Sequence, residues 1–125
     1  MRGLILAGAA ALALLAGPAG AADSFYSGSR AYTIGVFGSA ARHWMELADR
    51  GHGPAQYNIG RMIYYGQGFP RDAIEAYKWF LLAMDSGVER SRVAARMVGE
   101  KLSSRQIAEA TVRAREWRQA RTRRY

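Results

Sequence analysis

The chain has 125 residues, of which 18 are lysine or arginine, 10 are aspartate or glutamate and none is cysteine. This length allows one small domain. The lack of cysteine excludes a disulfide scaffold, a thiolate metal site and a thiol nucleophile. Residues 1–89 carry equal numbers of acidic and basic side chains, so the whole net charge of +8 falls in residues 90–125. The sequence therefore predicts a neutral body with a basic C-terminal end.

Residues 1–21 have the features of a secretory signal peptide. Met1 and Arg2 precede an apolar run from Leu4 to Ala16, and small residues follow as far as Ala21. The apolar run is shorter than the roughly 20 residues that a membrane-spanning helix needs. We expect cleavage after Ala21 and export to the periplasm or out of the cell; an uncleaved anchor is the alternative.

The rest of the chain contains an internal repeat. The unit Ala-x-x-Trp-x-x-x-Ala occurs at 41–48 and at 76–83, and Ala-x-x-Trp occurs again at 114–117. A period of this length predicts stacked helical hairpins. Small residues let neighbouring helices approach closely, and we expect Trp44, Trp79 and Trp117 to fill equivalent layers of the stack.

The segment between the two full units carries a more specific pattern. It reads Ala55-Gln56-x-x-Ile59-Gly60 and then Gly66-x-Gly68-x-x-x-Asp72. With the flanking Ala-x-x-Trp units, this resembles the Sel1-like repeat, a relative of the tetratricopeptide repeat. Residues 55–87 form the best copy, and 29–51 and 88–120 resemble degenerate copies. The resemblance implies an all-α fold, a short α-solenoid of antiparallel helix hairpins over residues 22–120, followed by a basic tail at 121–125.

Residues that favour helix ends support the same division. Pro54 suits the first turn of a helix, and Asp72 with Glu75 and Ser103 with Gln106 have the spacing of capping boxes. We predict helices at 29–35, 39–50, 54–65, 72–86, 90–100 and 103–120, with fraying after about 120. The helix at 72–86 is apolar on nearly all sides, which predicts that it is the buried centre.

The helix at 54–65 offers a candidate binding surface. A spacing of four and then three residues places Tyr57, Arg61 and Tyr64 on one face, away from the apolar side chains of the same helix. Tyrosine and arginine are enriched in binding hot spots. The resemblance implies that the first helix of each hairpin lines a concave surface, so we expect these three residues to contact a partner; the alternative is that the preceding hairpin covers them.

Residue patterns typical of catalysis are weak. His43 and His52 do not have the spacing of zinc ligands. Ser27-Gly28-Ser29 lacks the frame of a nucleophile elbow, and Gly66-x-Gly68 lacks the rest of a phosphate loop. We therefore predict no enzyme activity, no cofactor and no metal.

Two functions of different classes follow. The first is a non-enzymatic periplasmic adaptor that binds a peptide or protein segment on its concave face. The alternative is an envelope-binding protein whose basic C-terminal helix meets anionic lipid or cell-wall polymer, through Arg113, Arg115, Arg118, Arg121, Arg123 and Arg124. Export argues against a nucleic-acid partner. Self-association is a further expectation, because about three good repeats are needed for independent stability.

Overall fold

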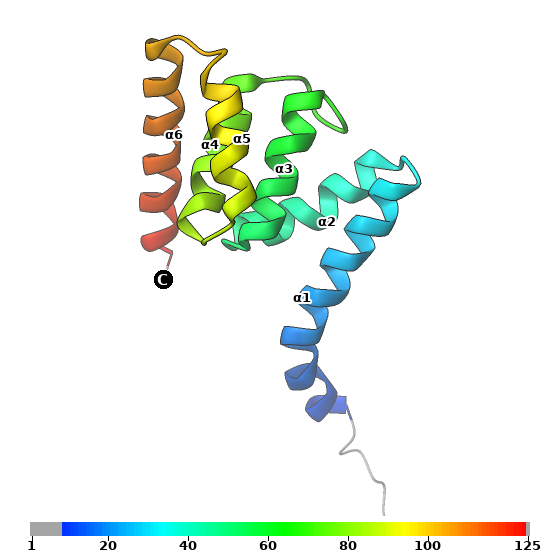
Figure 1. Ribbon diagram of the computed structural model, residues 1–125. Coiled ribbons are helices and arrows are strands. Elements are labelled where there is room, and N and C mark those ends of the chain that lie inside the picture. Colours follow the sequence, from blue (N-terminus) through cyan, green and yellow to red (C-terminus); the bar gives the residue numbers. More distant parts are fainter. Residues whose placement is uncertain (1–8, 125) are drawn as a thin grey trace, which may run out of the picture.

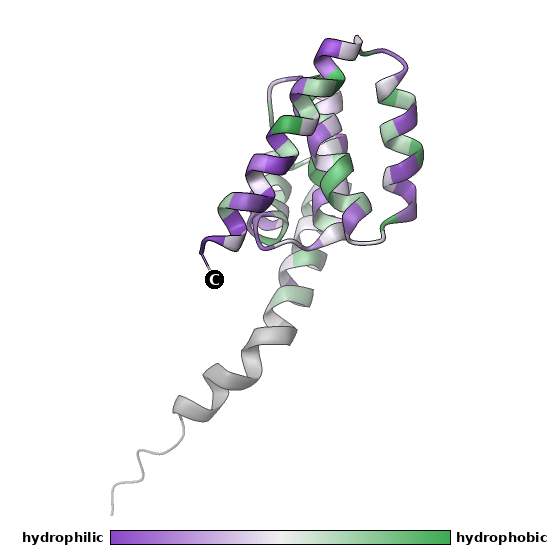
Figure 2. Ribbon diagram, turned by 90° about the vertical axis from the view of Figure 1, so that its left-hand side faces the viewer, coloured by the Kyte–Doolittle hydropathy of each residue, from purple (hydrophilic) through white to green (hydrophobic). Residues whose placement is uncertain are grey.

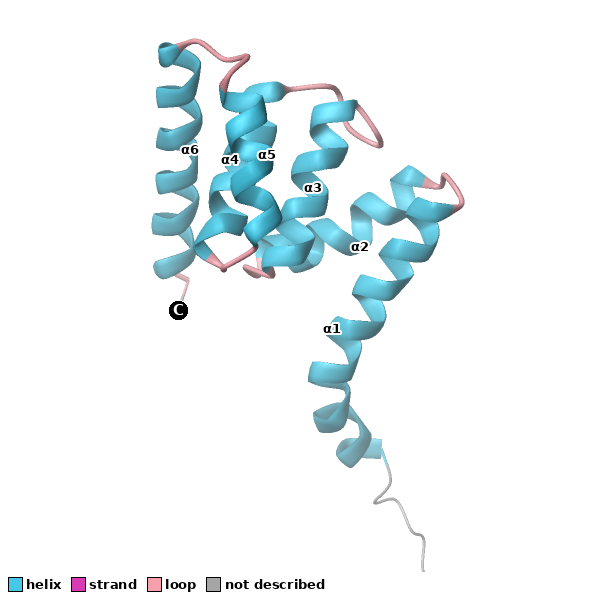
Figure 3. Ribbon diagram, in the orientation of Figure 1, coloured by secondary structure: helices cyan, strands magenta, loops and turns pink. Residues whose placement is uncertain are grey.

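The computed structural model describes residues 9–124, with side chains from residue 20 onward, and its regular elements over that range are all helices (Figure 3). The helices are α1 (Ala9–Thr33), α2 (Phe37–Asp49), α3 (Gly53–Tyr65), α4 (Ala73–Asp85), α5 (Glu89–Gly99) and α6 (Ser104–Thr122). The all-α prediction is therefore confirmed for the described part of the chain. No described helix combines the length and the apolar character needed to cross a membrane.

The predicted boundaries hold to within two residues except at the N-terminal end. The first helix was expected at 29–35, but α1 already begins at Ala9 and ends at Thr33. From Ala21 onward the additional length is explained by packing, because Ala21 and Phe25 extend the stripe of α1 that contacts the core, in register with Gly28 and Tyr32. The predicted signal peptide lies partly outside the described residues, and α1 runs through its expected cleavage site.

The helices form successive packed pairs (Figure 1). α1 packs on α2 and α3 packs on α4, while α2 also contacts α3. α4 packs against α3, α5 and α6, and its buried side chains include Trp79, Phe80 and Leu82. The prediction that this helix is the buried centre is confirmed. α5 and α6 both pack on α4, one after the other along the chain.

The tryptophans do not occupy equivalent positions, contrary to expectation. Trp44 packs back on α1: its Nε1 donates to the carbonyl oxygen of Phe25 at 3.1 Å, and its ring centroid is 5.5 Å from that of Tyr32. Trp79 instead meets Trp117 of α6, at 6.0 Å between ring centroids.

Phe80 takes the place in α4 that Trp44 takes in α2. A Cβ built on Gly28 would lie 2.5 Å from Trp44 Nε1, and one built on Gly60 would lie 2.7 Å from Phe80 Cε1. The cause is one additional residue between the tryptophan and the end of the helix. The closing bond of α2 runs from His52 N–H to the carbonyl of Leu47, three residues after Trp44, whereas that of α4 reaches Ala83, four residues after Trp79. One residue turns the side chain by about 100° around the helix.

The C-terminal helix extends further than predicted. α6 reaches Thr122 rather than 120. Arg121 holds this last turn, because its guanidinium carbon lies 5.6 Å from the ring centroid of Trp117. Arg118 Nε also donates to Asp85 Oδ2 of α4 at 2.6 Å. The helix thus continues two residues beyond the predicted end, and fraying of the last residues stays a prediction.

Candidate functional site

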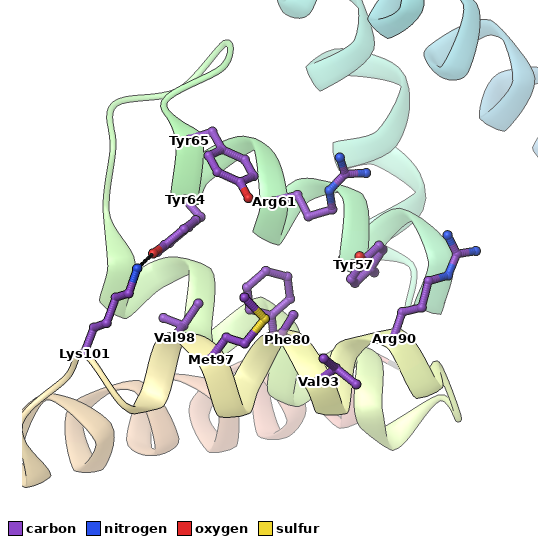
Figure 4. A pocket seen from close by; sticks show the side chains of 11 residues that line it. Tyr57, Arg61, Tyr64, Tyr65, Phe80, Arg90, Val93, Met97, Val98 and Lys101 are labelled. Atoms are coloured by element: carbon purple, nitrogen blue, oxygen red, sulfur yellow. Dashed lines mark hydrogen bonds between the residues drawn. The ribbon is translucent and has the colours of Figure 1, made fainter.

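A groove of about 280 Å³ lies between α3 and α5 (Figure 4). α3 provides one wall, α5 the other, and Phe80 of α4 lies between them. The lining residues are Tyr57, Arg61, Tyr64, Tyr65, Phe80, Arg90, Val93, Ala94, Met97, Val98 and Lys101.

The three residues of the predicted strip all line this groove. Tyr57, Arg61 and Tyr64 project from α3, and each is half-buried. The Arg61 guanidinium carbon is 5.8 Å from the ring centroids of both Tyr57 and Tyr32, so one cation joins α3 to α1. The structure thus brings the three side chains together, and their role in binding stays a prediction.

Sequence reasoning missed the wall formed by α5. Val93 is 54% exposed and Met97 is 62% exposed, although both are apolar. They share one helix face with Arg90 and with Lys101 just beyond the helix, at helical spacing. That periodicity is visible in the sequence, but the resemblance to the repeat identifies the segment only as part of a degenerate copy.

Positive charge gathers at both ends of the groove (Figure 4). Arg90 lies near one end, with its guanidinium carbon 5.6 Å from the Tyr57 ring centroid. At the other end, Lys101 Nζ donates to Tyr64 Oη at 3.1 Å. That hydrogen bond raises the pKa of Lys101 above its ordinary value, so the ammonium stays charged. No carboxylate is among the lining residues, within the part of the chain whose side chains are described.

The arginines of the predicted anionic-surface set do not form one free patch. Arg113 binds Glu75 of α4 at 2.9 Å and Glu109 at 2.5 Å, and Arg118 binds Asp85. Arg121 stacks on Trp117. The remaining members, Arg115, Arg123 and Arg124, are exposed, and much of α6 is hydrophilic (Figure 2). Half of the set therefore contacts the protein's own body.

The two histidines make structural contacts. His43 Nδ1 lies 3.3 Å from Ser24 Oγ. His52 Nδ1 accepts a hydrogen bond from the Ala55 N–H at 3.2 Å and so caps α3. Among the residues whose side chains are described, no group of three potential ligands is placed to hold a metal ion.

Comparison with known proteins adds the family of the central hairpin. Residues 53–88 match the sequence model of the Sel1 repeat. The chain is 35% identical over 51 residues to "DAP3-binding cell death enhancer 1" of Rattus norvegicus and to the protein of the same name of Mus musculus. These 51 residues are 41% of this chain but 10% of each relative, so the chain spans about a tenth of the relatives' length.

The match coincides with a structural unit. It begins with α3, includes α4, and ends in the turn before α5. Sel1 repeats generally mediate protein–protein interactions. The chain therefore carries a Sel1 repeat at residues 53–88, with α3 and α4 as its two helices.

Proposed function

We propose that this protein is a non-enzymatic binding module whose groove between α3 and α5 holds a segment of a partner protein. One wall of the groove belongs to a Sel1 repeat, a unit that generally serves protein–protein interaction. The name of the two relatives describes binding to another protein, DAP3. From these relatives we infer for this chain only the ability to bind a protein, whichever protein that is.

The exposed apolar wall of the groove carries this proposal. Val93, Met97 and Tyr65 are each more than half exposed and lie around the buried ring of Phe80. Apolar side chains that gather at a concave surface mark binding sites more often than scattered ones do. Methionine adapts its shape to an apolar partner, and tyrosine and arginine supply most hot spots.

A selection from a library of random peptides tests the proposal. Peptides selected on the purified protein are then measured against Met97→Ser and against Tyr57→Ala with Arg61→Ala. We expect each variant to bind at least about tenfold more weakly, since truncation of a hot-spot residue costs about 2 kcal/mol or more. Val112→Ser is the matched control, because Val112 is an exposed apolar residue of α6 that does not line the groove. Unchanged binding in both groove variants contradicts the proposal.

We further propose that the module acts in the periplasm or outside the cell, which rests on the signal-peptide features of residues 1–21. Binding of anionic lipid or cell-wall polymer by α6 stays a prediction. The contacts of Arg113, Arg118 and Arg121 with the rest of the protein leave fewer arginines free for it. Self-association also stays a prediction, and sedimentation at several protein concentrations tests it.

A further inference from the structure

The charged side chains that line the groove all have one sign of charge. They are the cations Arg61, Arg90 and Lys101. None of the three cations has a carboxylate within ion-pair distance among residues 20–124. Within the same range, several other arginines, such as Arg96 and Arg105, also lack a carboxylate partner, so what distinguishes the groove is that its cations gather around an apolar surface.

Arg90 and Lys101 stand at the two ends of the groove, while Arg61 lies on α3 between Tyr57 and Tyr64 (Figure 4). Lys101 lies at one end beside Tyr64, while Arg90 and Tyr57 lie at the other (Figure 4). Val93 and Met97 lie between Arg90 and Lys101 along α5. A ligand that is complementary to such a surface has an apolar centre and negatively charged ends.

We propose that the groove selects an extended acidic segment, in which an apolar side chain contacts Val93 and Met97 and carboxylates on both sides of it meet Arg90 and Lys101. This inference rests on the proposed function, because it specifies which protein segments the same groove accepts.

The separation of the cations sets the spacing of the ligand. Arg90 and Lys101 are eleven residues apart on and just beyond α5, which corresponds to about 16 Å at a rise of about 1.5 Å per residue. An extended chain advances about 3.3 Å per residue. Its side chains alternate between two faces, so two carboxylates and an apolar residue between them point to the same side at positions i, i+2 and i+4. The two carboxylates should therefore be four residues apart, about 13 Å, with the apolar residue midway between them, and the long side chains of Arg90 and Lys101 bridge the remaining distance.

The contribution of each charge should be modest. Arg90 and Lys101 are exposed, and pairs between exposed charges are screened by salt. We expect each cation to change the affinity about two- to fivefold, with the larger effect on the association rate. The apolar centre should supply most of the affinity.

Short synthetic peptides with blocked termini test this inference on the full purified protein. One peptide has carboxylates four residues apart around a central leucine, a second has lysines in their place, and a third has glutamines. Two further acidic peptides place the carboxylates closer together or about eleven residues apart, the latter to match a helical ligand. Binding is followed by fluorescence anisotropy at low salt and at about 0.15 M salt.

We expect the acidic peptide of matched spacing to bind about tenfold more tightly than the lysine peptide at low salt, and less so at higher salt. Arg90→Gln with Lys101→Gln should remove this preference, and Arg90→Glu with Lys101→Glu should reverse it. Arg92→Gln with Arg105→Gln is the matched control, because both arginines are exposed and neither lines the groove. Circular dichroism of each variant verifies that it is folded.

The outcomes separate this inference from the proposed function. Equal affinity for the acidic, lysine and glutamine peptides overturns the acidic preference. If Met97→Ser then weakens the binding of all three peptides, the groove is still the binding site. An acidic preference that survives Arg90→Gln with Lys101→Gln overturns the inference, because the attraction then comes from the basic chain as a whole. Tightest binding at the eleven-residue spacing overturns the extended conformation. Failure of every peptide to bind also overturns the inference, and the library selection then decides the proposed function independently.

Discussion

At the residue scale, Gly60 allows the close approach of α3 to α4. A Cβ at this position would lie 2.7 Å from Phe80 Cε1, so alanine can fit only if the buried ring moves. We expect Gly60→Ala to reduce the free energy of unfolding by about 1–3 kcal/mol, less the gain of up to about 1 kcal/mol in helix propensity. Urea unfolding measures this change.

Gly38 in α2 provides the control for that substitution. Nothing lies within 4 Å of a Cβ built on Gly38. Gly38→Ala should therefore leave the stability unchanged or raise it by several tenths of a kcal/mol. If the Gly60→Ala protein were as stable as the Gly38→Ala protein, the packing of the Phe80 ring would not require glycine at position 60.

His52 makes the stability of the protein depend on pH. Its Nδ1 must be unprotonated to accept the Ala55 N–H, and its ring is half-buried, 5.3 Å from the Phe25 ring. Burial lowers the pKa of His52 below its ordinary value of 6.5, so the unfolded chain binds the proton more tightly than the folded one. The stabilisation is therefore complete above about pH 6.5 and is lost as the pH falls through the lowered pKa.

Asparagine at position 52 separates the cap from its titration. Asparagine is a good N-cap residue and carries no titratable group. We expect the free energy of unfolding to fall less between pH 7 and pH 5 in His52→Asn than in the wild type, by chemical denaturation at each pH. His43→Asn, the control, should keep the wild-type decrease. A wild-type decrease that persists in His52→Asn assigns the pH dependence to other groups.

At the element scale, α6 is attached to α4 by an apolar contact and by ion pairs. Trp117 meets Trp79, while Arg113 reaches Glu75 and Arg118 reaches Asp85. Glu75 also binds Lys78, which is buried against the Trp79 ring. The basic helix therefore uses part of its charge to stay attached to the repeat.

Arg113→Gln tests the role of this charge. Arg113 and Glu75 are only about one-third exposed, and we expect the loss of their charge-assisted bond to cost about 1 kcal/mol after allowance for solvent screening. Hydrogen exchange of the α6 amides should accelerate more than that of α3. Arg115→Gln, at an exposed arginine of the same helix, should change neither the free energy of unfolding nor the exchange of the α6 amides. Equal exchange in the two variants would mean that the Arg113–Glu75 pair does not help to hold α6, and that the tryptophan pair and Arg118 suffice.

At the scale of the whole molecule, the predicted cleavage after Ala21 divides α1. The residues of α1 that contact Trp44, namely Phe25 and Tyr32, follow the cleavage site. The mature chain should therefore keep this aromatic cluster and the packing of α1 on α2. An exported protein of this kind retains every residue of the groove.

Mass spectrometry of the protein recovered from the periplasm tests the processing. We expect a mature chain that begins at Ala22. Ala19→Glu with Ala21→Glu should block cleavage, because signal peptidases need small residues just before the cut. A cytoplasmic protein that retains Met1 would refute both the cleavage and the proposed location.

The sequence by itself determined the helices and their order. Caps, turn glycines and apolar periodicity are local signals, so they predicted five of the helices closely and placed Tyr57, Arg61 and Tyr64 on one face. Which faces meet depends on the packing of the helices. One additional residue separates Ala83 from Gly87, compared with Ala48 and Gly51, and the sequence shows this difference. Only the packed helices show its consequence, which is that Phe80 rather than Trp79 takes the position of Trp44.

The packing between helices also explains the features of the site that the sequence did not predict. Whether Val93 and Met97 are exposed, and whether Arg113 is free or bound to Glu75, depends on helices that are distant along the chain. Residue types and their spacing define what each helix can offer. The packing of α5 on α4 leaves α5 with an apolar wall that has a cation at each end. The packing of α6 on α4 instead places much of the charge of α6 in ion pairs with the rest of the protein.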